Sequence, residues 1–149
     1  SAGYFRESGK LYGYSSQGRF SPVPFLSFEV QYTGLYEELF DFTTSLSLYS
    51  VFLNYHSIRN EFISFRWGIG MKGIVGNHNL TGFGFNAAAE LYPFRPVSLH
   101  CNFSIGKYSE LLGTLNIHVN RTAFFAGWKY LQAGQVGISG LIGGVQVYF

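Results

Sequence analysis

Large apolar residues alternate with small or polar residues along most of this 149-residue chain. The alternation is clearest in segment 62–74, where Phe65, Trp67, Ile69 and Met71 fall on one face and Ser64, Arg66, Gly68, Gly70 and Lys72 on the other. Segments 80–92 and 97–106 repeat the pattern. A period of two residues is that of a β-strand, because successive side chains point to opposite faces. The pattern therefore predicts an all-β chain.

Glycine, asparagine and proline clusters divide the chain into eight segments of this kind. The predicted strands are 24–33, 44–55, 62–74, 80–92, 97–106, 111–119, 122–132 and 138–149. Strand 44–55 has the least regular pattern, and it places Val51 and Leu53 on the nominally polar face. The connections are short, as in the Asn120–Arg121 turn, so neighbouring strands are expected to pair antiparallel.

The composition decides which face is expected to be outside. Aromatic residues make up 19% of the chain and charged residues only 12%. A soluble sandwich or lipocalin-like barrel also alternates, but it needs charged residues to coat its outer surface. No apolar run approaches the roughly 18 residues of a membrane helix. These observations favour a transmembrane antiparallel up-and-down β-barrel of eight strands, with apolar residues facing lipid and polar residues facing the lumen.

The last strand carries a further signal. The chain ends in Gly-Gly-Val-Gln-Val-Tyr-Phe, with Val145, Val147 and Phe149 on one face, after a strand containing Ala-Gly-Trp-Lys-Tyr-Leu at 126–131. Over roughly residues 24–149 this resembles the small bacterial outer-membrane barrels of the broad OmpA/OmpX/OmpW-like group. The resemblance implies a bacterial outer-membrane location, outer-membrane lipids as surroundings, and a barrel-assembly machinery that reads Val145, Val147 and Phe149. The group includes anchors, adhesins, small-solute pores and lipid A enzymes, so it does not specify the activity.

Residues 1–22 are surplus to an eight-stranded barrel at 23–149. An even strand number brings both ends of a barrel to one side, and a ninth strand would break that rule. We therefore expect residues 1–22 to form a periplasmic arm that ends at Pro22 and Pro24. Its aromatic and basic residues are types enriched in interfaces, so it is a candidate contact with other envelope proteins. The alternative is that 4–14 is a true strand and that one of the eight predicted strands is a divided one.

The predicted lumen face carries ionisable residues, namely Glu29, Arg66, Lys72, Glu90, His100, His118 and Lys129. The lumen of a small barrel is filled by side chains, and buried charges there must be paired. Arg66 and Glu90 lie on adjacent strands and are the expected pair. A proton or ion path through the same groups is the alternative interpretation.

Catalysis has little support in the sequence. Barrel-embedded lipid A deacylases use a His and a Ser two residues apart, whereas His100 and His118 are followed at that spacing by Asn102 and Asn120. Asparagine is not a nucleophile, so we expect no enzyme. The lone cysteine, Cys101, and the spacing of the histidines predict neither a metal site nor a cofactor. A net charge of +2 without a basic run argues against nucleic acid.

The connecting segments complete the expectation. The outer loops 34–41, 76–79, 106–109 and 133–139 are all short. The periplasmic turns each hold an arginine, namely Arg59, Arg95 and Arg121, and Arg6, Lys10 and Arg19 of the arm are expected on the same side. His56 and His78 are expected in connecting segments, as solvated or rim residues. The sequence favours a structural or accessory barrel acting as a subunit or anchor, with a narrow channel for protons, ions or small solutes as the alternative and a lipid-modifying enzyme third.

Overall fold

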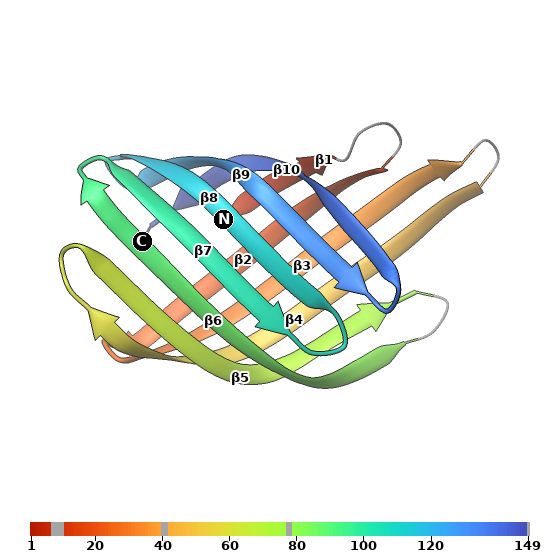
Figure 1. Cartoon of the computed structure of the whole chain (residues 1–149), viewed down its shortest axis with the longest axis horizontal. Helices are drawn as coiled ribbons and strands as arrows, with labels where there is room; N and C mark the ends of the chain where they lie inside the picture. The colour runs from red at the N-terminus through yellow and green to blue at the C-terminus, as the bar shows by residue number, and fades with distance from the viewer. Residues whose placement is uncertain (7–10, 40–41, 77–78, 149) are drawn as a thin grey trace.

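The computed structural model describes residues 1–6, 11–39, 42–76 and 79–148, and within them the fold is a closed antiparallel barrel (Figure 1). Its strands are β1 (Ala2–Arg6), β2 (Leu11–Val23), β3 (Leu26–Leu39), β4 (Phe42–Arg59), β5 (Ile63–Val75), β6 (Leu80–Phe94), β7 (Val97–Ile105), β8 (Ser109–Val119), β9 (Thr122–Ala133) and β10 (Val136–Val147). Each strand pairs with its neighbours in sequence, and β1 closes the barrel on β10. In the described part of the chain, no helix is long and apolar enough to cross a membrane.

The predicted all-β, up-and-down barrel is confirmed, but the predicted count of eight strands is wrong because the barrel has ten. Residues 1–22 do not form an arm, since they supply β1 and nearly all of β2. The alternative with a divided strand is also wrong, because β3–β10 each correspond to one predicted strand. Pro24 lies in a two-residue turn, and Pro22 in an irregular stretch of the β2–β3 ladder. A proline interrupts a ladder without ending the sheet.

The two faces of the wall differ as the alternation predicts. Trp67, Ile69 and Met71 point outward from β5, while Arg66 and Lys72 on the same strand are buried inside. The prediction for strand 44–55 is wrong in phase. In β4, Leu53 is exposed on the outer face, whereas Leu48 and Phe52 are the apolar residues that are buried inside.

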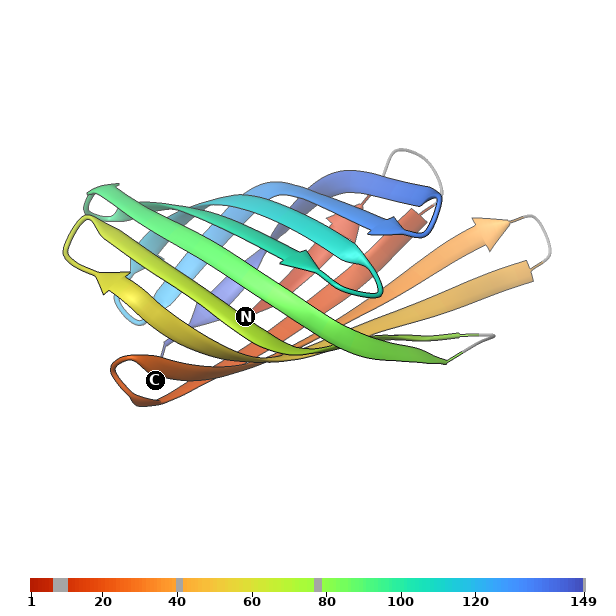
Figure 2. The same ribbon diagram turned by 60° about the horizontal axis from the view of Figure 1, so that its bottom comes forward.

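The ends of the barrel have different shapes. At one end, here called the turn end, lie the short turns at 24–25, 60–62, 95–96 and 120–121. At the other, here called the hairpin end, the hairpins β3–β4 and β5–β6 project beyond β7–β10 (Figure 2). The ladders agree with this view, because β4 pairs with β5 only from Ser47 onward and β6 pairs with β7 only from Phe85 onward.

The interior is divided into a polar part and an apolar part. Along β3 the inward residues Ser27, Glu29 and Thr33 are followed by Leu35, which is also buried. The apolar part comprises Phe5, Leu35, Leu48, Tyr108, Leu131 and Ile142, drawn from six different segments of the chain. The barrel therefore contains a small hydrophobic core next to its hairpin end, in addition to polar groups nearer the turn end.

Candidate functional site

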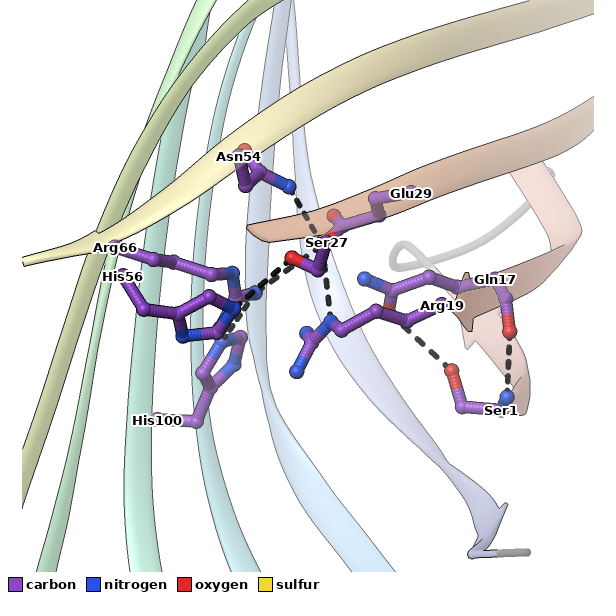
Figure 3. Close-up of polar contacts among 9 residues, drawn as sticks. All are labelled: Ser1, Gln17, Arg19, Ser27, Glu29, Asn54, His56, Arg66 and His100. Carbon is purple, nitrogen blue, oxygen red and sulfur yellow. Dashed lines mark hydrogen bonds and ion pairs between the residues drawn. The ribbon is translucent and has the colours of Figure 1, made fainter. Parts of the chain in front are cut away.

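The polar interior is organised around Glu29 of β3. One oxygen, Oε2, lies 3.2 Å from Arg19 Nε, 3.4 Å from Arg66 Nη2 and 3.4 Å from Asn54 Nδ2, and each of these nitrogens donates to it (Figure 3). Glu29 is only 1% exposed, while the Arg19 side chain is 28% exposed. One buried carboxylate thus holds donors from β2, β4 and β5 together. Charge-assisted hydrogen bonds of this kind are stronger than neutral ones.

The predicted pair of Arg66 with Glu90 is wrong. Arg66 contacts Glu29, which lies two strands away, and its Nη2 is also 3.4 Å from Nε2 of His100 on β7. Glu90 instead accepts a hydrogen bond of 3.1 Å from Ser98 Oγ. The prediction considered only adjacent strands, whereas a long arginine side chain reaches across a narrow barrel to strands further around the wall.

His56 is not a residue of a connecting segment. It lies in β4, and its Nε2 is 3.0 Å from Ser27 Oγ on β3. Figure 3 shows its ring beside Arg66 and His100. The other histidine assigned to a connecting segment, His78, falls outside the described residues.

A second group surrounds Ser98 of β7. Its hydroxyl donates to Glu90, lies 2.8 Å from His118 Nε2 and accepts from Asn116 Nδ2 at 3.1 Å. The His118 ring lies beside that of Tyr148 in a tilted arrangement, with 5.7 Å between ring centroids. Burial, together with the nearby Glu90, raises the pKa of the Tyr148 hydroxyl.

This Ser–His contact has the length of a nucleophile–base pair, but its surroundings differ from a hydrolase site. In a triad the acid hydrogen-bonds the second nitrogen of the base and orients it. Here Glu90 accepts from the hydroxyl of Ser98 itself, and Ser98 has no exposed surface. The arrangement fits a structural role, in which the Ser98 hydroxyl forms hydrogen bonds with buried polar groups of β6 and β8.

A third group lies closer to the apolar part. Lys129 Nζ is 3.1 Å from Glu110 Oε1 and 3.2 Å from Thr33 Oγ1, and Gln31 Nε2 donates to Glu110 at 2.8 Å. Glu110 was not among the predicted site residues, because the predicted strand started at residue 111. Extending its inward series, Asn116–Thr114–Leu112, by one more step would have identified it.

Lys72 is held differently. Its ammonium donates to Ser104 Oγ at 2.6 Å and lies 3.7 Å from the ring centroid of Tyr108. The aromatic face attracts the cation, so Tyr108 replaces part of the hydration that Lys72 loses on burial. The Tyr108 hydroxyl in turn donates to the backbone oxygen of Tyr49 at 3.3 Å.

The seven predicted lumen residues therefore all lie inside the barrel but divide into separate groups: Glu29 with Arg66 and His100, Glu90 with His118, Lys129, and Lys72. Space left among the polar groups is small, since the cavity between Arg19, Glu90 and Lys129 has a volume of about 50 Å³. That volume accommodates one or a few water molecules. Glu29, Arg66, Glu110 and Lys129 are paired within the barrel, whereas Glu29 Oε1 and Arg66 Nε are buried without a hydrogen-bond partner among the described residues.

The remaining predicted residues lie on the outer surface or at its ends. Arg59, Arg95 and Arg121 are exposed at the turn end, and Arg59 Nη1 donates to the Pro24 oxygen at 3.4 Å. Arg6 does not join them, because it lies at the far end of β1, and Arg19 points into the interior. Lys10 falls outside the described residues.

The terminal strand and the cysteine face outward. Val145 and Val147 are exposed on the outer face of β10, and Phe149 lies outside the described residues. Cys101 is exposed on the outer face of β7. Among the described residues, no three His, Cys, Asp or Glu side chains are grouped so as to hold a metal ion. No family model, no curated protein and no solved structure matches this chain.

Proposed function

We propose that this protein is a bacterial outer-membrane β-barrel with a sealed interior, acting as a structural or accessory component of the envelope. The observation that carries the proposal is the inside-out distribution of side chains. Glu29, Arg66, Lys72 and Lys129 are buried within the barrel. Large apolar residues are exposed on every strand from β2 to β10. In water this arrangement would expose apolar surface and bury charge, both of which are unfavourable. In a bilayer it is the expected one.

Aromatic residues at the ends of the wall add support. Phe20, Phe25, Phe62 and Phe94 are exposed in or beside the turn-end connections. On β2 and β3 the rings of Tyr12 and Tyr36 stack with centroids 5.7 Å apart, toward the hairpin end. Membrane barrels carry aromatic girdles at both interfaces.

The orientation follows from charge. Arg59, Arg95 and Arg121 are exposed at the turn end, where anionic phospholipid headgroups would attract them. We assign the turn end to the periplasm and the projecting hairpins to the outside. An accessory role then rests on the surfaces at the two ends, because Ala2–Arg6 and Leu11–Val23 are strands of the wall rather than an arm available to a partner.

Tryptophan fluorescence tests the membrane assignment. The chain has two tryptophans, Trp67 and Trp128, and both point outward. In vesicles of phospholipid brominated on its chains, the variants Trp67→Phe and Trp128→Phe should both be strongly quenched relative to unbrominated vesicles. Aqueous iodide should quench neither. Folding without lipid or detergent, with both tryptophans open to iodide, would contradict the proposal.

The accessory role needs a separate test. The wild type and an Arg59→Ser/Arg95→Ser/Arg121→Ser variant would be purified from native membranes in mild detergent, with Lys107→Ser as a control at the other end. We expect a stoichiometric partner that the triple variant loses and the control keeps. Purification of the wild type alone would contradict the accessory role while leaving the membrane assignment intact.

A further inference from the structure

An apolar cavity of about 270 Å³ lies inside the hairpin end of the barrel. We call it the chamber. Its lining comes from opposite sides of the wall, with Tyr108 from the β7–β8 connection, and consists of Leu35, Leu46, Leu48, Tyr108, Leu131, Gln132, Ala133, Val136 and Ile138. Most of these residues belong to or pack against the interior hydrophobic core. The chamber is therefore a space that the core leaves unfilled.

The character of the chamber limits what occupies it. Cavities lined by aliphatic side chains stay dry, because water there would lack hydrogen-bond partners. An apolar cavity of roughly 150 Å³ is large enough to bind benzene, and the chamber is nearly twice that size. Its volume is close to the lower end of the roughly 300–1,000 Å³ range of ligand pockets. The occupant it fits is therefore apolar and small.

The chamber is open at the rim of the barrel. Ala133 and Val136 flank the β9–β10 turn, where Gly134 adopts a φ of 62°. Val136 points to the chamber side of β10 and yet is 62% exposed. This part of the rim is also low, because β3–β4 and β5–β6 project past it (Figure 2). Because the rim is low and apolar here and the outer wall beside it is also apolar, a hydrocarbon chain has a short path from the outer surface into the chamber.

Below the chamber Tyr108 forms a floor. Its ring separates the aliphatic lining from the ammonium of Lys72, which lies 3.7 Å from the ring centroid. Beneath it the ion pair of Lys129 with Glu110 marks the start of the polar interior. The depth available to an apolar occupant therefore ends at Tyr108.

We propose that the chamber binds one unbranched hydrocarbon chain, supplied by a membrane lipid or by a free fatty acid. The chain enters over the β9–β10 turn, packs against Leu48 and Ile138 and stops at Tyr108. This gives the barrel a ligand site that a purely structural role does not require.

The test places a fluorophore at the floor. Tyr108→Trp in a Trp67→Phe/Trp128→Phe background gives a single tryptophan as the reporter. Bromine quenches it only at short range, and the barrel wall separates it from the lipid of the bilayer. In one arm, dodecanoic acid brominated at its terminal carbon is added to unbrominated vesicles. In the other, the phospholipid chains are brominated and no free acid is present. Saturable quenching in the first arm identifies a free fatty acid, and quenching in the second identifies a membrane lipid chain.

Blocking the chamber should abolish the signal. Ala133→Phe added to the reporter fills the chamber from its rim, so quenching should fall to the background level. Ala126→Phe on the outer face of the same strand should leave it unchanged. If Ala133→Phe fails to fold, unbrominated dodecanoic acid should restore the fluorescence of the reporter by competition. Absence of quenching in both arms, or quenching that neither Ala133→Phe nor competition removes, would overturn the inference. Outer tryptophans quenched in the same vesicles would still uphold the membrane assignment.

Discussion

Replacing Glu29 by glutamine should test how the polar interior is held together. Glu29 Oε2 accepts from Arg19, Arg66 and Asn54, and the carboxylate is almost fully buried. Glu29→Gln keeps the size and an acceptor oxygen but removes the negative charge. The Arg66 guanidinium, also buried, then loses its ion-pair partner.

The expected cost follows from the geometry. At 3.4 Å, the attraction between Arg66 and Glu29 is about 5 kcal/mol with an effective dielectric constant of roughly 20. Breaking a buried pair by removing one partner typically costs about 3–5 kcal/mol. Arg19 adds at most about 1 kcal/mol, because water reaches its partly exposed side chain. We therefore expect Glu29→Gln to lower the free energy of unfolding by about 3–5 kcal/mol.

The measurement is reversible guanidinium unfolding of the refolded protein in detergent micelles, followed by tryptophan fluorescence. Glu90→Gln is the matched control, because Glu90 is half-buried and accepts a hydrogen bond from Ser98 but forms no ion pair among the described residues. Loss of that bond should cost about 1 kcal/mol. The double variant Glu29→Gln/Arg66→Met should be more stable than Glu29→Gln alone, since no unpaired guanidinium is left at position 66.

A cost for Glu90→Gln that equals or exceeds that of Glu29→Gln would refute the reasoning, because it would make Glu90 the main counter-charge of the interior. So would a double variant whose loss is the simple sum of the two single losses. Additive effects would mean that Arg66 and Glu29 do not stabilise one another.

Three further predictions concern the packing, the second ion pair and the sealing of the interior. Gly127→Ala places a methyl group against the backbone of Gly113 and Thr114 and should lower the free energy of unfolding by about 1–3 kcal/mol. In the control Gly113→Ala the added atom meets nothing within 4 Å, so the free energy of unfolding should change by less than about 1 kcal/mol. Comparable losses from both variants in thermal unfolding would contradict the close packing at Gly127. Lys129→Met leaves the buried Glu110 without its ion-pair partner and should lower the free energy of unfolding by about 3–5 kcal/mol. The control Lys107→Met changes an exposed lysine and should lower it by less than about 0.5 kcal/mol, so equal urea midpoints for the two variants would count against a buried pair. The purified protein should give no steady single-channel current in planar bilayers, because side chains fill the polar interior to a residual cavity of about 50 Å³, and a reproducible conductance would favour the channel alternative.

The alternation of residues was enough to predict the architecture and most of the facing. In β5 and β7, one alternating series consists of large apolar residues except for Gly73 and Cys101, and this series points outward. The predicted number of strands is wrong at the N-terminus, because the requirement for an even number of strands is already met by eight. Two additional strands preserve the same parity, so the argument cannot distinguish eight strands from ten.

The sequence pattern does not predict which side chains contact one another across the interior. Alternation assigns Glu29 and Arg66 to the inner face but does not specify the circumference or shear of the barrel. Those quantities decide which inward side chains meet. The facing predicted for Arg66 is right, but its predicted partner is wrong, because its guanidinium contacts Glu29 two strands away and not Glu90 on the adjacent strand.

The irregular pattern of β4 has a physical origin that the sequence alone left unresolved. A strand of a barrel with a polar lumen alternates strictly, and the pattern of segment 44–55 assigns Val51 and Leu53 to the lumen although Phe52 between them is also apolar. In the structure, β4 has apolar residues on both faces, because Leu48 and Phe52 pack inside the barrel while Leu53 faces outward. Loss of alternation in one strand is thus what an apolar interior segment produces. Of the β4 residues that face inward, Leu48 belongs to the interior hydrophobic core and Leu46 packs against it, and both line the chamber in which we propose that a hydrocarbon chain binds.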